Sequence, residues 1–285
     1  MNKLVGVCWS ITSNCNLSCP VCCRYIEDGI LDLKKKKKLI DIITNSGVKK
    51  ITISGGEPLL EQDFLEILSY SRSVGLKTSL ATNGLLLSER ILDELDYVLD
   101  ELQPPLDGHC AKAHSLHRGS EKHYYVIIDL LQKVLFRKFN TDISTVVTLH
   151  NHTLLPKMKE LLTSHKINKW KLFQFLPISY GLKKGSFFYL SDNIFESAVL
   201  EVKKNPGSMD IDYGIANNER LSSYFNISPI GNLYLPCGSS YSTYGNVFEF
   251  DNINNLASIA KINFDFHYKR FWREIDQFNI KSKTF

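Results

Sequence analysis

Strand-like and helix-like segments alternate along the first 180 residues of this 285-residue chain, and this alternation limits the fold more than any other feature. Six apolar or β-branched runs are typical of buried strands, at residues 4–11, 50–54, 77–81, 97–103, 142–149 and 171–175. Segments with helical spacing lie between them, at residues 31–45, 61–74, 88–95, 120–136 and 153–164. Repeated strand and helix units favour a parallel sheet with right-handed crossovers. The pattern predicts the α/β class and a partial (β/α)6 barrel, with its functional residues at the carboxyl ends of the strands.

The pattern changes after residue 180. A turn-rich segment at residues 179–186 leads to one expected helix at residues 192–203. Two short apolar runs, 221–227 and 233–235, flank the turn-forming residues Ser228-Pro-Ile-Gly-Asn232 and predict a β-hairpin. We therefore expect a partial-barrel core over residues 1–180 and a small α+β C-terminal extension over residues 181–285.

The composition is that of an ordinary globular protein. Hydrophobic residues make up 44% of the chain and charged residues 22%, and the formal net charge is +4. This charge is too small to indicate nucleic-acid binding. No apolar run reaches the roughly 18 residues of a membrane-spanning helix, and the first residues lack the cleavage site of a signal peptide. We expect a cytoplasmic protein whose partners include neither a membrane nor a nucleic acid.

Four of the seven cysteines crowd together directly after the first expected strand. Cys15, Cys19 and Cys22 have the spacing C-x3-C-x2-C. Three thiolates on one loop can hold three irons of a 4Fe-4S cube and leave the fourth iron without a protein ligand. Structural zinc takes four ligands, often from two C-x2-C pairs, and this loop has no second pair. The spacing favours an iron-sulfur cluster in a reducing compartment over zinc or a disulfide framework.

The cysteine loop resembles the signature of the radical S-adenosylmethionine superfamily, and further motifs of that superfamily follow it in order. Ser54-Gly-Gly-Glu-Pro58 comes after the second expected strand and matches the GGEP motif. Thr82-Asn83-Gly84 ends the third strand. Leu106-Asp107-Gly108, then His114 and Arg118, follow the fourth strand. The resemblance covers residues 1 to about 180.

This resemblance implies two cofactors, one 4Fe-4S cluster held by Cys15, Cys19 and Cys22, and S-adenosyl-L-methionine bound at the open iron. It implies a cofactor site that includes Gly55, Gly56, Glu57, Pro58, Thr82 and Asn83, with Glu57 accepting from the methionyl ammonium group. In such enzymes one electron, from a donor such as flavodoxin or ferredoxin, reductively cleaves the cofactor. The resulting 5′-deoxyadenosyl radical abstracts hydrogen from a substrate carbon, while the protein orients the reactants and excludes water.

Two positions in the loop depart from the superfamily pattern. Members usually carry an aromatic residue just before the third cysteine, where it packs on the adenine side of the cofactor, and this chain has Val21 there. Cys23 directly follows the third cysteine. The superfamily spacing selects Cys22 as the ligand, so we expect Cys23 to be a small buried hydrophobe.

Two segments suggest different classes of substrate. Lys169-Trp-Lys171 resembles the strand of viperin-like enzymes whose basic residues bind a nucleoside triphosphate, so Lys169 and Lys171 are candidate phosphate ligands. Lysine is seldom buried, so two lysines with solvated tips remain an equally open interpretation. Residues 227–247 resemble the opening of the SPASM or twitch extension of peptide-modifying enzymes. That extension normally holds auxiliary clusters through several cysteines, and only Cys237 is present here, so we expect a degenerate, cluster-free lid.

The preferred hypothesis is a radical S-adenosylmethionine enzyme, of oxidoreductase or lyase type, that abstracts hydrogen from a peptide or another small molecule. Peptide natural-product maturation is the reaction class that the C-terminal extension favours. A viperin-like nucleoside triphosphate dehydratase is the alternative. A non-catalytic iron-sulfur-binding module is the third hypothesis, motivated by Val21 in place of the aromatic residue.

One run of charge stands out, Lys34 to Lys38. Apolar residues directly after it, including Leu39 and Ile40, supply a buried helix face. This favours a solvated helical surface for the lysines. A docking site for an acidic leader peptide or a reductant protein is the alternative interpretation.

Overall fold

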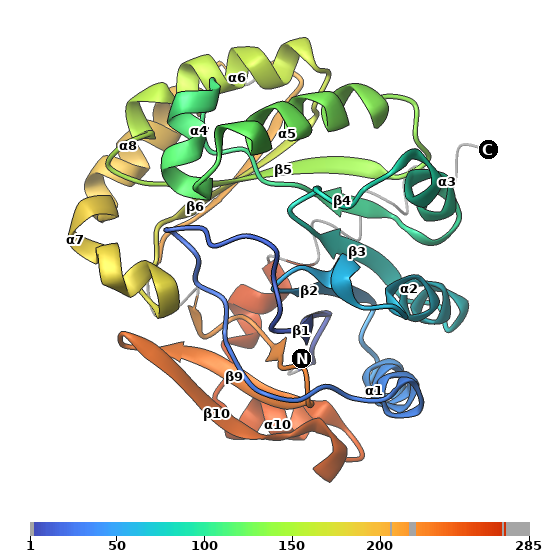
Figure 1. Ribbon diagram of the computed structural model, residues 1–285. Coiled ribbons are helices and arrows are strands. Elements are labelled where there is room, and N and C mark those ends of the chain that lie inside the picture. Colours follow the sequence, from blue (N-terminus) through green and yellow to red (C-terminus); the bar gives the residue numbers. More distant parts are fainter. Residues whose placement is uncertain (1–2, 206, 217–220, 270, 272–285) are drawn as a thin grey trace.

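The fold is an open α/β barrel, and the computed structural model describes it for all residues except 1–2, 206, 217–220, 270 and 272–285 (Figure 1). Six parallel strands stand side by side in chain order. They are β1 (Gly6–Thr12), β2 (Lys50–Gly55), β3 (Lys77–Ala81), β4 (Glu101–Gln103), β5 (Asn140–Val147) and β6 (Lys169–Gln174). The prediction of a partial (β/α)6 barrel in the α/β class is confirmed.

The sheet continues past both ends of this six-stranded arc. On one side β7 (Asp210–Gly214) pairs in parallel with β6. On the other, β8 (Asn226–Ile227) pairs in parallel with β1 and leads into an antiparallel hairpin of β9 (Asn232–Cys237) and β10 (Ser240–Asn246). The residues after position 180 therefore extend the sheet of the first 180 residues at both edges.

Helices lie around the outside of the arc of strands (Figure 1). They are α1 (Leu33–Asn45), α2 (Phe64–Ser73), α3 (Glu89–Val98), α4 (Ala111–Arg118), α5 (Glu121–Lys133), α6 (Leu155–Ser164), α7 (Gly185–Phe188), α8 (Asp192–Lys203) and α10 (Ile253–Ile259). Short 3-10 helices follow several strands, including η1 (Pro58–Leu60) and η3 (Ser179–Lys184). Among the described residues no helix is long and apolar enough to cross a membrane.

The two faces of each strand have opposite character, as β1 illustrates. Val7, Trp9 and Ile11 have no exposed surface and belong to the main hydrophobic core. Side chains alternate along a strand, so Cys8 and Ser10 point to the opposite face, into the barrel. The core thus lies between the sheet and its helices.

The interior face of the barrel is polar along its whole height. Strand register places the residues of this face beside one another from strand to strand. They are Cys8, Ser10, Thr52, Ser54, Ser79, Glu101, Gln103, Asp142, Ser144, Lys169 and Lys171. This lining can hydrogen-bond a polar molecule inside the barrel.

Some predicted element boundaries were wrong. Residues 97–98 were predicted to begin the fourth strand, but they are the last two residues of α3. The helix buries Leu92 and Leu95 on one face, and Tyr97 lies on the opposite face, 72% exposed. Four elements, α4, α7, β7 and β10, were not predicted from the sequence. The buried residues of α4 include His114 and His117, so this helix lacks the apolar period that reveals a helix.

The lysine run at the start of α1 is only partly solvated. Lys36 is 2% exposed and its Nζ lies 2.7 Å from Asp63 Oδ1 and 3.2 Å from Glu61 Oε2. Lys37 Nζ lies 2.5 Å from Glu66 Oε1. The expectation of a fully solvated face is therefore wrong for Lys36, because acidic residues at the start of α2 draw its ammonium group into the interface between the two helices.

Candidate functional site

The predicted cluster ligands lie on a loop that leaves the carboxyl end of β1 and crosses the open side of the barrel, between α7 and the β9–β10 hairpin (Figure 1). Cys19 is buried, Cys15 and Cys22 are half-buried, and all three are free thiols. Cys22 N donates to Cys19 O at 3.1 Å, so a turn brings these two cysteines together. Cys23 is exposed, so the expectation that it is buried is wrong.

The GGEP turn holds this loop through its backbone. Gly56 N donates to Thr12 O at 2.8 Å, and Glu57 N donates to Asn14 O at 2.7 Å. A side chain at position 56 would place its Cβ 2.0 Å from Asn14 O, so only glycine permits this approach. Pro58 begins η1 and is buried. The loop and the end of β2 are therefore locked together before any ligand binds.

Glu57 is the central acceptor of the strand ends. Its side chain has no exposed surface. Oε1 accepts from Thr82 Oγ1 at 2.6 Å and from Leu59 N at 3.1 Å, and Oε2 accepts from Asn83 N at 2.7 Å. Burial raises the pKa of Glu57, against the opposing effect of these three donors. A ligand at this edge would meet the backbone of residues 55–57, while the Glu57 carboxylate fixes the turn after β3.

Asn83 connects that turn to the cysteine loop. Its Nδ2 donates to Asn16 Oδ1 at 2.7 Å and approaches Cys15 Sγ at 3.9 Å, and its Oδ1 accepts from Leu85 N at 2.9 Å. Thr82 Oγ1 also accepts from Gly84 N at 3.1 Å. The structure therefore brings together Cys15, Glu57, Thr82 and Asn83, as the order of the sequence motifs implies.

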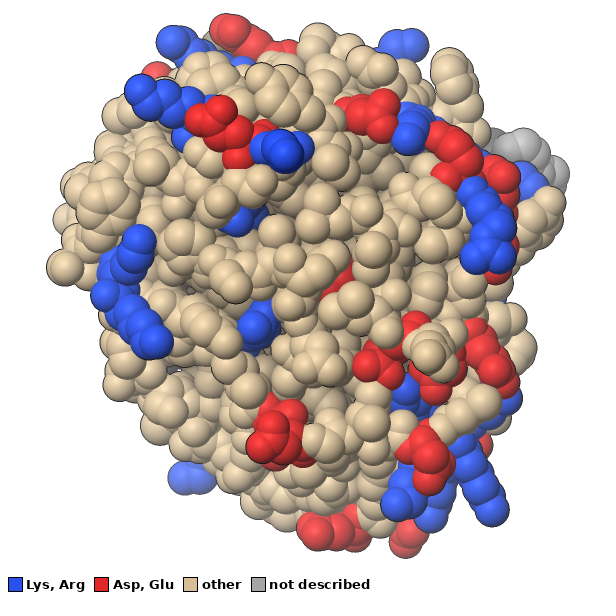
Figure 2. Space-filling model, in the orientation of Figure 1, with Lys and Arg blue, Asp and Glu red and all other residues tan. Residues whose placement is uncertain are grey.

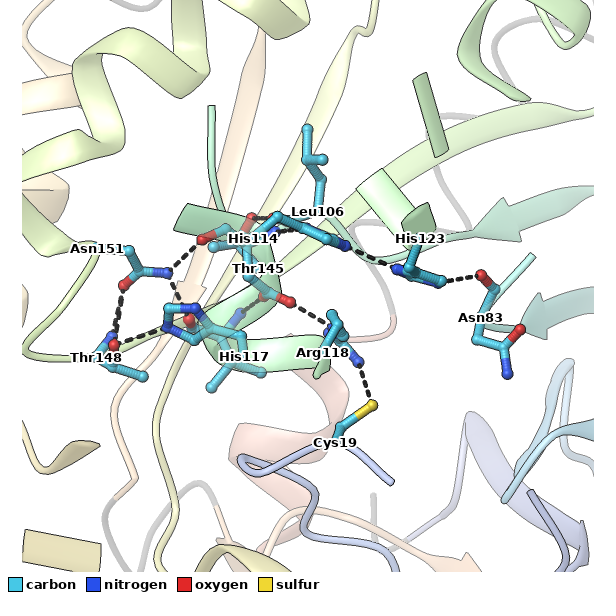
Figure 3. A network of polar contacts seen from close by, with 12 residues as sticks. Cys19, Asn83, Leu106, His114, His117, Arg118, His123, Thr145, Thr148 and Asn151 are labelled. Atoms are coloured by element: carbon cyan, nitrogen blue, oxygen red, sulfur yellow. Dashed lines mark hydrogen bonds and ion pairs between the residues drawn. The ribbon is translucent and has the colours of Figure 1, made fainter. Parts of the chain in front are cut away.

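A buried ion pair supports the loop from the side of β4. Asp107 has no exposed surface, its Oδ2 lies 2.5 Å from Arg118 Nε, and its Oδ1 accepts from Val146 N at 2.7 Å. Arg118 Nη1 in turn approaches Cys19 Sγ at 4.0 Å (Figure 3). Burial would raise the pKa of Asp107, but the Arg118 guanidinium outweighs it and the pKa falls below its ordinary value. Arg118 is thus held between the Asp107 carboxylate and the sulfur of Cys19, a predicted cluster ligand.

A chain of neutral histidines links the same region to Asn83 (Figure 3). Asp107 N donates to His114 Nδ1 at 3.1 Å, so the proton of His114 lies on Nε2, 2.7 Å from His123 Nδ1. His123 Nε2 then donates to Asn83 O at 2.8 Å. Burial lowers the pKa of His114 to about 3 and lowers that of His123 as well, so both rings stay neutral. The turns after β3 and β4 are therefore joined through two buried rings.

A second branch of this network was also missed by sequence reasoning. His117 Nε2 lies 2.8 Å from Thr148 Oγ1, and Asn151 Oδ1 accepts from Thr148 N at 2.7 Å. Asn151 Nδ2 donates to Asp107 O at 3.0 Å (Figure 3). His117 and Asp107 lie more than 30 residues before Thr148 and Asn151 and share no motif with them, so no local signal could have identified these contacts.

The donor set of the loop fits a 4Fe-4S cluster. Burial raises the pKa of both the Cys19 and Cys22 thiols, and iron would stabilise the thiolate forms. Leu17 N donates to Cys15 Sγ at 3.4 Å, and hydrogen bonds to sulfur tune such clusters. Within the described ranges no three His, Cys, Asp or Glu side chains converge on a single ion. A cube takes one thiolate at each of three separate irons and needs no such convergence.

Val21 lies in an aromatic environment. It is 3% exposed and packs in a small cluster with Phe175, which follows β6, and Phe188 of α7. The ring centroids of these two phenylalanines are 5.6 Å apart. Val21 therefore packs against two aromatic side chains that lie far from it in the sequence.

The candidate phosphate ligands lie at the opposite end of the barrel, where the strands begin. Lys171 is 5% exposed, and its Nζ lies 2.8 Å from Glu101 Oε1 and 3.0 Å from Asp142 Oδ2. Lys169 Nζ lies 3.4 Å from Asp142 Oδ2, and Lys50 Nζ lies 2.9 Å from Glu101 Oε2. Burial would raise the pKa of Glu101, but the Lys171 and Lys50 ammonium groups bring it well below its ordinary value. The two lysines belong to a buried network of ion pairs, and their predicted contact with a triphosphate remains a prediction.

Replacing Glu57 with alanine should destabilise the protein, because the buried donors Thr82 Oγ1 and Asn83 N and the part-buried Leu59 N lose their acceptor. We expect the free energy of unfolding to fall by roughly 3 kcal/mol, from a cost of about 1–3 kcal/mol for each unsatisfied buried group. Affinity for S-adenosylmethionine should fall about tenfold or more as the Thr82 and Asn83 turn relaxes. Urea unfolding and calorimetric titration measure the two effects.

Glu66→Ala is the matched control for this change. Glu66 lies on the same side of the barrel, at the start of α2, but its side chain is 50% exposed. Its removal should change stability by less than about 0.5 kcal/mol and leave cofactor affinity unaltered. Equal affinities in wild type and Glu57→Ala would remove Glu57 from the cofactor site.

Comparison with known proteins identifies relatives of the chain. The Radical SAM superfamily family model matches residues 9–162. The PqqA peptide cyclase of Rhodopseudomonas palustris is 25% identical over 294 aligned positions, covering 96% of this chain and 75% of that protein. An S-adenosylmethionine-dependent nucleotide dehydratase of Lacinutrix mariniflava is 24% identical, covering 82% of this chain and 51% of that protein. The chain spans about half the length of several curated relatives that it matches.

The fold also has solved counterparts. SuiB of Streptococcus suis, in its complex with the precursor peptide SuiA, superposes with a TM-score of 0.72 at 16% identity. The superposition covers 94% of this chain and 66% of SuiB. The likeness therefore includes β7 and the β8–β10 region as well as the six strands of the barrel.

Proposed function

Because the chain belongs to the radical SAM superfamily, we propose that it is an enzyme that reductively cleaves S-adenosylmethionine and abstracts hydrogen from a peptide. One observation carries this proposal. The loop with the three free cysteines contacts the residues that follow β2, β3 and β4, at the carboxyl end of the barrel strands. Cys15, Cys19 and Cys22 would hold a single 4Fe-4S cluster. When bound, the cluster and S-adenosylmethionine supply a 5′-deoxyadenosyl radical.

The other residues of the mouth would bind and orient the cofactor. The NH groups of Gly56 and Glu57 already donate to Thr12 O and Asn14 O, so the carbonyl oxygens of Gly55 and Gly56, with Pro58 closing the turn, would accept from the cofactor beside the cysteine loop. Thr82 and Asn83 line the next strand end, where Glu57 fixes them. These positions agree with the site that the sequence motifs imply, and they support our proposal that these residues bind S-adenosylmethionine.

The C-terminal hairpin would form one wall of the substrate site. Tyr25 of the cysteine loop stacks on Tyr234 of β9, with ring centroids 4.4 Å apart, and Tyr241 of β10 donates to Cys23 O. Cys237 is the one cysteine in the chain after Cys110, too few for an auxiliary 4Fe-4S cluster. The sequence predicts a lid over residues 181–285, but β7 pairs with β6 and extends the barrel itself, so we infer that the β8–β10 region is the part that acts as a cluster-free lid on the core of residues 1–180.

Two observations support a peptide as the substrate. The PqqA peptide cyclase aligns with 96% of the chain, including the lid. The polar lining of the barrel, rich in Ser and Thr hydroxyl groups, suits the amide groups of a peptide. Peptide maturation is therefore our proposal for the reaction class.

A nucleoside triphosphate dehydratase remains the second candidate, because the S-adenosylmethionine-dependent nucleotide dehydratase of Lacinutrix mariniflava aligns with 82% of the chain. The ion pairs of Lys171 with Glu101 and Asp142 argue against it. A triphosphate would have to displace two carboxylates from a buried ammonium group, and breaking such pairs costs several kcal/mol.

The nucleotide hypothesis is tested by the release of 5′-deoxyadenosine from the reconstituted protein with dithionite. We expect release at a slow background rate that millimolar nucleoside triphosphates leave unchanged. Mass spectrometry of the added nucleotide checks for turnover.

The double variant Lys169→Ala with Lys171→Ala should have a lower free energy of unfolding, because Glu101 and Asp142 would then be close, buried and without these cations.

A nucleotide that accelerates release and changes in mass would overturn the peptide proposal. A protein that binds its cluster and S-adenosylmethionine but never releases 5′-deoxyadenosine would instead be the non-catalytic module.

A further inference from the structure

An exposed patch of aromatic, apolar and basic side chains adjoins the cysteine loop. We call it the η3–α7 patch and define it as Arg24, Tyr180, Leu182, Lys183, Lys184 and Phe187. Tyr180 is 39% exposed, and Leu182 and Phe187 are each 49% exposed. Contiguous apolar groups of this kind on a protein surface commonly mark a binding site for another protein.

The patch is fastened to the loop that carries the cluster ligands. Gly181 N donates to Cys22 O at 3.0 Å. The Arg24 guanidinium lies 4.9 Å from the centroid of the Tyr180 ring, and Arg24 Nη2 donates to the Tyr180 hydroxyl at 3.4 Å. Cys22 is half-buried and Cys23 is exposed, so the loop reaches the surface next to the patch.

The far side of the patch is anchored as well. His150, just after β5, donates from Nε2 to Phe187 O at 2.8 Å, and the two rings lie 4.1 Å apart. The patch is therefore held between two strand ends of the barrel and presents a defined surface rather than a loose loop.

The charged side chains of the patch itself are all basic. They are Arg24, Lys183 and Lys184, and the nearest acidic residues along the chain, Glu27, Asp28 and Asp192, lie just outside the two segments that form the patch. Lys183 and Lys184 are exposed. Figure 2 shows basic side chains near the α7 corner of the molecule that stand apart from acidic ones. A surface of this kind attracts an acidic protein and orients it during encounter.

The lysine run on α1 is less suited to that role. Lys36 and Lys37 are paired with Glu61, Asp63 and Glu66. The run lies on a helix outside the barrel, whereas the η3–α7 patch is bonded directly to Cys22. Because electron transfer slows steeply with distance, a donor protein gains most by docking beside the cluster loop.

We propose that the η3–α7 patch is the docking surface for an acidic one-electron carrier protein. This inference rests on the proposed function, since the cluster there requires an external electron. The carrier loses one electron and the cluster gains it, with no bond made or broken in the transfer. Lys183 and Lys184 attract the acidic surface of the carrier, and the exposed rings of Tyr180 and Phe187 form the contact nearest to the loop.

The test compares two reductants of the reconstituted protein, reduced flavodoxin and dithionite. Charge reversal in Lys183→Glu with Lys184→Glu should slow reduction by flavodoxin about tenfold or more at low ionic strength. The loss should shrink as salt screens the charges. Reduction by dithionite, a small ion, should stay within about twofold of wild type if the barrel and cluster are intact. Bleaching of the visible cluster absorbance reports both rates, and calorimetry of oxidised flavodoxin binding gives the affinity independently.

Lys34→Glu with Lys35→Glu is the matched control, because it reverses two exposed lysines on α1. Its flavodoxin rate should equal that of wild type. Lys183→Ala with Lys184→Ala should give an intermediate loss and excludes an effect of the new glutamates. The inference would be overturned if wild type and the Lys183/Lys184 charge-reversal variant had equal flavodoxin rates and affinities. It would also be overturned if only the α1 control were reduced more slowly by flavodoxin. A protein that dithionite reduces but that never cleaves S-adenosylmethionine would refute the proposed function instead.

Discussion

Replacing any one of Cys15, Cys19 and Cys22 with alanine is expected to abolish both the cluster and the release of 5′-deoxyadenosine. Three thiolates are the minimum that fixes a cube and leaves one iron open, so two cannot retain it in this form. The three positions lie on one loop that is bonded to the ends of β2 and β3. Wild-type protein reconstituted without oxygen should contain about four irons per chain, and each variant should contain far less. Iron and sulfide analysis, with chromatography of the nucleoside product, measures the outcome.

Cys23→Ala is the control for these three variants. Cys23 is exposed, and the described contact between β10 and this residue is made through its backbone oxygen. Removing its side chain should leave iron content and product release close to wild type. Iron loss in Cys23→Ala, or about eight irons in the wild type, would contradict the assignment of one cluster to the other three cysteines.

The barrel could be predicted because its signals are local. The first strand ends at Thr12, directly before the cysteine loop, and the GGEP turn follows β2. The motifs themselves therefore mark the carboxyl ends of these strands. β3 and α8 have the predicted bounds. In these segments the periodicity of apolar residues reflects burial against the helices.

The supports of the site could not be predicted, because they depend on contacts between distant segments. His123 and Asn151 are ordinary polar residues in the sequence, yet they join the turns after β3, β4 and β5. Lys171 shows the opposite case. Its type suggested a solvated or phosphate-binding side chain, and the neighbouring Glu101 and Asp142 instead make a buried ion pair stable. Burial of polar groups is decided by such partners, which spacing along the chain does not reveal.

The second large effect is expected at Asp107, where substitution by asparagine should cost about 3–5 kcal/mol of unfolding free energy. The amide retains an acceptor for Val146 N but brings no negative charge to Arg118, whose guanidinium is mostly buried beside Cys19. An uncompensated buried cation accounts for most of the predicted loss. Urea unfolding of the apoprotein measures it. Asp129→Asn is the control, because that carboxylate is 61% exposed on α5, and its loss should cost less than about 1 kcal/mol.

The same pair predicts a pH dependence with a definite sign. The folded-state pKa of Asp107 lies below its ordinary value, because the Arg118 guanidinium outweighs the effect of burial. The stabilisation by the pair is therefore fully present above the unfolded carboxyl pKa of about 3.9 and is lost as pH falls through the lower folded pKa. Asp107→Asn lacks this titration, so the difference in stability between the two proteins should be constant between about pH 5 and 8 and should narrow only below about pH 4. A difference that already narrows near neutral pH would mean that Asp107 is protonated in the folded protein, and the ion pair could not then be what holds Arg118 beside the cluster loop.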